Sequence, residues 1–391
     1  MDNPGGDVTE VNDNTLNGAE SHTEGAGKPG RRILGHAVRT VCFLAVCVLI
    51  WIFASYMFVP KDGASYNTKV YDSLPDGTVD AIFIGASGFW DGISPMTMWS
   101  ETGITSYVFA SSNCSPQISY LMVKEALKKQ HPKVMFLSPM YIAKFQAFDQ
   151  VQLRLYQGLT NRKLTIDKLR ICAQIAKDEG VETGVNGLLP LLAYHDNWKN
   201  VTEVTFLHRS EGTYMGQRCW SFFNEPCNRT KQDLMDRAKK NERSFEYNEL
   251  ALGYYRKLIA LCKAADTKVV LLTLPNHLKR IKFEPQRQFA EEQGIDNIDL
   301  NDPQYLDILD IDNKTEWRDQ YHLNYWGSIK LSKWLGPFIQ DRYGIPDRRS
   351  LSDPSSGIWL EHYSMFYENL YWLTPGVLKE PGEVLLQPGM K

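Results

Sequence analysis

One uninterrupted apolar segment constrains this chain more than any other feature. Residues 41–59 read VCFLAVCVLIWIFASYMFV and contain no charged side chain. A helix rises about 1.5 Å per residue, so this segment spans roughly 28 Å, close to the hydrocarbon thickness of a bilayer. A core helix of a soluble domain is rarely apolar on every side. A cleaved signal peptide has a shorter leader and a clear cleavage site. We therefore expect an uncleaved transmembrane anchor over residues 31–60.

The charges around this segment predict its orientation. Arg31, Arg32 and Arg39 precede it, and basic residues favour the cytoplasmic side of a membrane. Residues 1–30 hold glycines and acids, have no Lys or Arg before Lys28, and offer almost nothing apolar to bury, which is typical of a disordered tail. We expect a single-pass cell-membrane protein with a cytoplasmic tail over residues 1–30 and an extracytoplasmic domain from residue 61 onward.

Composition excludes several classes of function and partner. With 43 basic and 46 acidic residues the chain has no overall basic character, so nucleic acid is not an expected partner. No group of His, Cys and Asp has metal-ligand spacing, and residues 85–88 lack the Lys and glycine pattern of a phosphate loop, so we expect no metal and no cofactor. Outside the cell, Cys219 and Cys227 face an oxidising compartment. The sequence is compatible with a disulfide between these two cysteines and also with two free thiols.

Beyond the apolar segment, short apolar runs alternate with helical patterns. This alternation predicts an α/β domain with a parallel sheet. The middle of the chain, residues 145–246, reads as an insertion of helix and loop, and residues 346–391 read as a surface-packed extension rich in Pro, Gly and aromatic residues. The expected strands are Thr78–Ile84, Ser106–Ala110, Lys133–Leu137 and Thr267–Leu274, and the expected helices are Pro116–His131, Asn248–Ala265 and Asn324–Tyr343.

Two polar motifs stand where a parallel sheet concentrates chemistry, at the carboxyl ends of its strands. Ser87 follows the first strand in a turn of small residues, where its hydroxyl can be exposed. Asp319 and His322 precede the last helix, and an Asp three residues before a His can hold one imidazole nitrogen and leave the other free as a base. Each motif alone is common, since Asp-x-x-His is often a helix cap. Together, in this order, they predict a Ser-His-Asp triad.

These motifs and their surroundings resemble the SGNH (GDSL-like) hydrolase family. The matching segments are DAIFIGASGFWDGISP over residues 80–95, SYVFASSNCSPQISYLMVKEALKKQHPKVMFLSP over 106–139 and WRDQYHLNYWGSIKLSKWLG over 317–336. More narrowly, the chain is similar to the membrane-anchored extracytoplasmic branch, which includes the D-alanine transfer protein of teichoic-acid modification and alginate O-acetylation proteins.

The resemblance implies a fold and a reaction. The fold is a flavodoxin-like three-layer α/β/α sandwich over residues 61–345, and the reaction is hydrolysis or transfer of an acyl ester of an envelope glycan or polymer. Ser87 is then the nucleophile, with His322 and Asp319 completing the triad. The apolar segment makes the membrane bilayer an expected partner, and the resemblance adds a membrane acyltransferase as a candidate partner.

The chain departs from the family pattern at the oxyanion donors. Residues 85–88 read GASG instead of a Gly-Asp-Ser opening, Asn113 replaces a loop glycine, and residues 138–140 read SPM where Gly-x-Asn-Asp is usual. The backbone N–H groups of Ser87 and Asn113, or the Asn113 amide, are the remaining candidate donors. Losing one such donor typically lowers the rate by about 10²–10³. A catalytically inactive protein of the same fold that binds or scaffolds an envelope polymer therefore stays open, as does a partner-binding domain that uses the insertion.

Two other histidines are candidates for substrate binding. His277 follows the fourth expected strand, and His195 lies in the insertion within the sequence YHDNW. The alternative for both is a capping or structural histidine, which is the commoner role.

Overall fold

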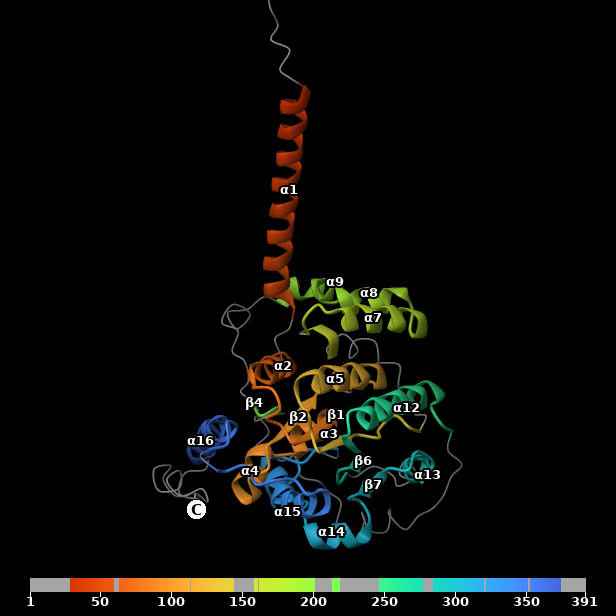
Figure 1. Ribbon diagram of the computed structural model, residues 1–391, viewed down its shortest axis with the longest axis vertical. Helices are drawn as coiled ribbons and strands as arrows, with labels where there is room; N and C mark the ends of the chain where they lie inside the picture. The colour runs from red at the N-terminus through yellow and green to blue at the C-terminus, as the bar shows by residue number, and fades with distance from the viewer. Residues whose placement is uncertain are drawn as a thin grey trace, which may run out of the picture. The chain divides into compact units, whose positions relative to one another are not determined.

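The computed structural model describes most of the chain, and its described residues separate into two compact units, one ending at Phe53 and the other running from Ala54 onward. The described ranges are 29–59, 63–112, 114–143, 158–160, 162–200, 213–218, 246–276, 284–319, 321–350 and 352–373. The N-terminal helix α1 covers Pro29–Phe58 (Figure 1). Its stretch Leu34–Phe58 is long and apolar enough to cross a membrane, as the sequence predicts. Of the predicted disordered tail, residues 1–28 lie outside the described ranges.

A five-stranded parallel sheet forms the centre of the second unit. Its strand order is β2-β1-β3-β6-β7. Counted along the chain this is 2-1-3-4-5, the order of flavodoxin-like doubly wound sheets. The α/β class and the parallel sheet are therefore confirmed. The strands are β1 (Ala81–Gly85), β2 (Ser106–Ala110), β3 (Val134–Leu137), β6 (Lys268–Thr273) and β7 (Asp296–Asp299).

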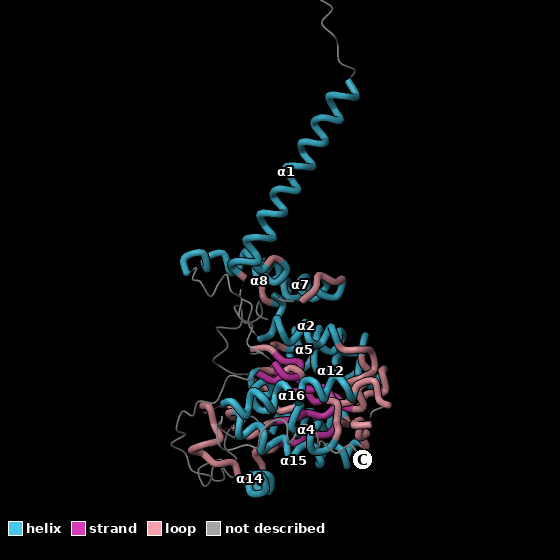
Figure 2. Tube along the Cα trace, turned by 90° about the vertical axis from the view of Figure 1, so that its left-hand side faces the viewer, coloured by secondary structure: helices cyan, strands magenta, loops and turns pink. Residues whose placement is uncertain are grey.

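Helices cover both faces of the sheet, giving three layers (Figures 1 and 2). Side chains alternate along each strand, so Ile82 and Ile84 belong to one buried cluster and Ala81 and Phe83 to the other. The helices that pack on the first face are α2 (Gly63–Ser73), α5 (Pro116–Lys129), α12 (Glu249–Ala264) and α13 (Glu284–Gln293); those on the second are α3 (Ser87–Gly92), α14 (Pro303–Leu309) and α15 (Tyr325–Tyr343), with α4 (Pro95–Thr102) beside α15.

The insertion adds a helical layer outside α5 and a small hairpin. Asp167 accepts hydrogen bonds from Lys124 and Lys128 and so ties the insertion to α5. Its helical elements are α7 (Ile166–Asp178), α8 (Val181–Leu188), α9 (Pro190–Tyr194) and the 3₁₀ helix η1 (His195–Asn200). We did not expect strands here, yet Thr213–Tyr214 (β4) pairs with Gln217–Arg218 (β5).

This hairpin docks on the outer strand of the sheet. The backbone N–H of Val108 donates to the carbonyl of Met215 at 3.0 Å. Gly216 has a φ of +89°, and a Cβ there would lie 2.0 Å from the Val108 carbonyl oxygen, so only glycine allows the hairpin to approach. The insertion therefore reaches the edge of the sheet at β2.

The described part of the C-terminal extension, up to residue 373, contributes side chains to the core. Helix α16 (Ser356–Leu373) buries Trp359, Tyr363, Phe366 and Leu370, which recur at intervals of four, three and four residues and so share one helical face. Ahead of this helix, Arg348 forms a two-pronged ion pair with the buried Asp80, one residue before β1.

Candidate functional site

Ser87 stands at the carboxyl edge of the sheet. Strand β1 ends at Gly85, Ala86 continues in extended conformation, and α3 begins at Ser87 itself. A Cβ at Gly85 would lie 2.6 Å from the Cβ of Ser138, so glycine is needed where β1 and β3 approach each other. This tight turn places the Ser87 hydroxyl just beyond the buried strand ends.

The structure brings Ser87, His322 and Asp319 together as the sequence predicts. Ser87 Oγ lies 2.8 Å from His322 Nε2, although the two residues are 235 positions apart. On the other side of the ring, His322 Nδ1 lies 2.8 Å from Asp319 Oδ1 and 2.9 Å from Oδ2. A hydroxyl, an imidazole and a carboxylate in this sequence of contacts have the geometry of a serine nucleophile with its base and orienting acid.

The loop before α15 holds the Asp319 carboxylate in place. The backbone N–H groups of Tyr321 and His322 donate to Asp319 Oδ1 at 2.7 and 3.0 Å. Partial burial by itself would raise the pKa of the Asp319 carboxyl, but the hydrogen bond and charge of His322, the Tyr321 N–H and Arg318 outweigh it and hold that pKa well below its usual range. Asp319 is therefore a carboxylate at neutral pH and favours the Nδ1-protonated imidazole.

A second group of charges, which we call the arginine cluster, lies directly against the triad. It consists of Asp91, Arg218 and Arg318. Arg218 donates to the two carboxylate oxygens of Asp91 at 2.8 and 2.9 Å, and Arg318 Nη1 donates to the same carboxylate at 2.9 Å. Arg318 Nε also donates to Asp319 Oδ2 at 3.2 Å. The cluster therefore links the helix of Ser87 to the carboxylate of the triad.

Sequence reasoning missed the arginine cluster. Asp91 is the sole charged residue between positions 81 and 100, and its side chain is only 1% exposed. A buried carboxylate needs cationic partners, so an isolated acid within an apolar segment was the available signal. The sequence does not show which cations supply this charge, because the arginines follow Asp91 by 127 and 227 positions.

Of the other predicted site residues, His195 is described, and its contacts do not include the triad. His195 Nδ1 lies 2.7 Å from the Leu192 carbonyl oxygen, and its Nε2 lies 3.7 Å from Asp196, so these contacts are local. Its segment η1 contacts α9 of the helical layer that packs outside α5, on the first face of the sheet, whereas α3 lies on the second face. Asn113 and His277 lie outside the described residues, as do Cys219 and Cys227. The Ser87 N–H belongs to the first residue of α3 and is the described member of the candidate oxyanion pair.

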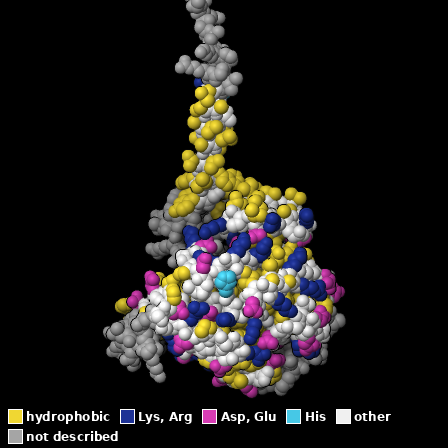
Figure 3. Space-filling view, viewed as in Figure 1, with side chains coloured by type: hydrophobic (Ala, Val, Ile, Leu, Met, Phe, Trp, Pro, Cys, Tyr) yellow, Lys and Arg dark blue, Asp and Glu magenta, His cyan; other side chains and the backbone are white. Residues whose placement is uncertain are grey.

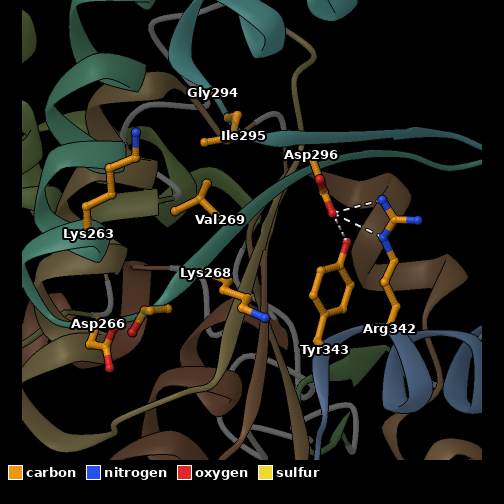
Figure 4. A pocket seen from close by; sticks show the side chains of 10 residues that line it. Lys263, Asp266, Lys268, Val269, Gly294, Ile295, Asp296, Arg342 and Tyr343 are labelled. Atoms are coloured by element: carbon orange, nitrogen blue, oxygen red, sulfur yellow. Dashed lines mark hydrogen bonds and ion pairs between the residues drawn. The ribbon is translucent and has the colours of Figure 1, made fainter.

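A surface pocket at the opposite edge of the sheet does not resemble a catalytic site (Figure 4). It lies at the amino ends of β6 and β7, where Lys268 and Asp296 contribute to its wall. Arg342 Nε and the Tyr343 hydroxyl donate to Asp296 at 3.1 and 2.9 Å, so the carboxylate is engaged within the wall. Across the described ranges, no group of three or more His, Cys, Asp or Glu side chains could hold a metal ion.

Comparison with protein-family models, with curated proteins and with solved structures finds no match for this chain.

Proposed function

We propose that this chain is a membrane-anchored, extracytoplasmic serine esterase or acyltransferase of the SGNH-like type. The observation that carries the proposal is the unbroken set of contacts from Ser87 Oγ through His322 to Asp319, with distances of 2.8 Å on both sides of the imidazole. The position of Ser87 at the carboxyl edge of a parallel sheet with flavodoxin-like strand order supports it further.

The proposed reaction passes through an acyl-enzyme. His322 Nε2 takes the Ser87 proton while Oγ attacks the ester carbonyl carbon, and the negative charge moves to the carbonyl oxygen. The Ser87 N–H and a donor from Asn113 are the proposed partners of that oxygen. When the tetrahedral intermediate breaks down, the leaving alcohol receives the proton from His322. Water or a glycan hydroxyl then gives a proton to His322 and attacks the acyl group, which regenerates Ser87.

Substrate and setting follow from the anchor and the resemblance. An α1 that stays in the membrane, with arginines on its N-terminal side, leaves the domain beside the outer membrane surface. An acyl ester of an envelope glycan or polymer is the proposed substrate, and a membrane acyltransferase is the proposed partner that supplies or receives the acyl group.

One observation favours a second function, a non-catalytic scaffold for an envelope polymer. The segment that replaces the family's oxyanion block begins at Ser138, whose N–H donates to the Ile84 carbonyl at 3.0 Å and whose carbonyl accepts from the Tyr255 hydroxyl at 2.6 Å. These backbone groups complete the sheet edge instead of facing a substrate. An active site would then depend on the Ser87 turn and the Asn113 loop alone.

The two functions separate in one labelling experiment. The full chain in detergent is treated with a serine-directed fluorophosphonate, and ester hydrolysis is measured in parallel. Ser87→Ala abolishes labelling, and His322→Ala lowers both labelling and turnover; the double variant is about as inactive as either single variant because the residues act as a unit. Ser364→Ala, on α16, is the matched control and keeps wild-type activity. A wild-type chain that neither labels nor turns over any acyl ester supports the scaffold.

A further inference from the structure

Exposed apolar side chains are concentrated in the helical part of the insertion. Among the described residues, more than half of the exposed large apolar side chains beyond α1 fall within residues 164–198. Figure 3 shows hydrophobic side chains collected over these helices. Such a concentration exceeds the scattered apolar residues of an ordinary surface and indicates an interaction site. We call it the insertion face, made of Leu164, Ile166, Leu169, Val181, Val185, Leu189, Leu192 and Trp198.

Helix α8 exposes its two valines and buries small residues. Its buried residues are Thr183, Gly184 and Gly187. Its outer side presents Val181, which is 71% exposed, and Val185, which is 40% exposed. A surface helix in water normally buries its apolar stripe and exposes polar residues. In α8, Leu188 packs against the core and Glu182 is exposed as in such a helix, but the two valines face outward.

The inward side of α8 leaves no room for the apolar residues. A Cβ at Gly184 would lie 2.4 Å from the carbonyl oxygen of Cys172, and a Cβ at Gly187 would lie 2.5 Å from Leu159. Close contact through glycine therefore fixes α8 against α7 and prevents a rotation that would hide the valines. The outward orientation of Val181 and Val185 is therefore fixed by the packing of α8 on α7.

The last residue of α1 is hydrogen-bonded to the segment that carries Trp198. Phe58 is the last residue of α1, and its carbonyl accepts a hydrogen bond from the side-chain amide of Asn197 at 2.8 Å, within the unit that begins at Ala54. Trp198, the next residue, is 60% exposed. The last residue of the predicted membrane span therefore contacts the residue that precedes Trp198 of the insertion face. Trp side chains and neighbouring lysines such as Lys199 favour the boundary between lipid and water.

We infer that the insertion face is a monotopic membrane surface that lies in the lipid interface of the bilayer crossed by α1. Amphipathic helices bind there with their apolar side among the acyl-chain boundaries. The inference rests on α1 remaining in the membrane but not on catalysis. Because α7 packs outside α5, and α5 packs on a face of the sheet, the sheet then lies along the membrane.

The test uses photolabelling of the full chain from within the lipid. The protein is reconstituted in phosphatidylcholine vesicles that carry a diazirine-tagged phosphatidylcholine, irradiated, digested and mapped by mass spectrometry. Peptides of α1 and of residues 164–199 should both carry the lipid adduct. The peptide that holds Ile308 is the matched control, because Ile308 is equally apolar and 59% exposed but lies on α14. It should remain at background.

Variants sharpen the result. Val181→Glu combined with Val185→Glu should lower the adduct on α8 several-fold, whereas Ile308→Glu should leave the whole pattern unchanged. If α1 is labelled but the insertion face carries no more label than the Ile308 peptide, the inference is overturned, and a protein becomes the expected partner of this face. Absence of label from α1 as well overturns both the inference and the anchor. Because the wild-type pattern is decisive, a variant that misfolds does not weaken the test.

Discussion

Replacing Asp91 with Asn tests whether the arginine cluster holds the site together. Asn keeps the shape of the side chain and removes its charge. The wild-type carboxylate, 1% exposed, is shared by Arg218, which is 11% exposed, and Arg318, which is 27% exposed. In the variant the two guanidinium groups face each other without the anion between them, and the Asn amide group adds a donor where an acceptor is needed.

The magnitude follows from these contacts. Two unit charges about 4 Å apart interact with about 4 kcal/mol at an effective dielectric constant of about 20, and burial of the ions offsets part of this attraction. Removing one partner of a buried ion pair destabilises proteins by about 3–5 kcal/mol. For a domain this large, each kcal/mol shifts the melting temperature by roughly 2 °C. We therefore expect Asp91→Asn to lower the free energy of unfolding by about 3–5 kcal/mol and the melting temperature by roughly 6–10 °C.

The assay is thermal and urea unfolding of the full chain in detergent, followed by tryptophan fluorescence. Asp347→Asn is the control, since Asp347 pairs with Arg349 but its side chain is 49% exposed, and it should change stability by less than about 1 kcal/mol. Adding Arg218→Met to Asp91→Asn should restore part of the loss, because it removes the uncompensated charge. If Asp91→Asn melts with the control, or if the double variant loses the full sum of both changes, our account of the cluster is wrong.

Three further predictions follow from other contacts. Asp319→Asn should lower ester turnover by about 10⁴-fold. Because the pKa of Asp319 is depressed in the folded protein, its carboxylate stabilises the fold above about pH 4 and loses this effect as the pH falls further. The urea midpoint of the variant should therefore fall less steeply on acidification than that of the wild type. Hydrogen bonds from Lys124 and Lys128 lower the pKa of Asp167 to about 2. At pH 7, Asp167→Asn should therefore lower the free energy of unfolding by about 1–2 kcal/mol, and between pH 4 and 2 the stability of the variant should change less than that of the wild type, which loses this contribution there. A variant whose stability falls with acid as steeply as the wild type contradicts this. Trp359→Ala should destabilise by about 3–5 kcal/mol, while Trp372→Ala on the same helix, 75% exposed, should stay within about 0.5 kcal/mol, and equal melting shifts would show that α16 is not part of the core.

The residues that sequence reasoning found share one property, which is that their signal is local. The runs AIFIG, SYVFA and KVVLLT are apolar enough to require burial on both faces, and all three are buried strands apart from the first residue of the last. Ser87 and the Asp319–His322 pair were recognisable because a turn after a strand and a three-residue spacing are both visible along the chain.

Elements that depend on a distant partner escaped prediction. Strand β7 reads DNID, and it is a strand because it pairs with β6 from Val270↔Asp296 to Thr273↔Asp299, not because its residues favour extended structure. The hairpin around Gly216 likewise packs closely on Val108, which lies more than a hundred residues earlier in the chain.

By itself, the sequence determined that one helix is apolar enough to span a bilayer, that a parallel sheet is buried between helices, and that a serine and an Asp-x-x-His pair follow it. Only the tertiary structure decided that Ser87 Oγ meets His322 Nε2, that Asp91 gathers Arg218 and Arg318, and that α8 shows its valines outward. The reason is physical. Burial and turn preferences act between neighbours in the chain, whereas ion pairs, the triad and the outward face of a helix are set by which distant segments the fold brings into contact.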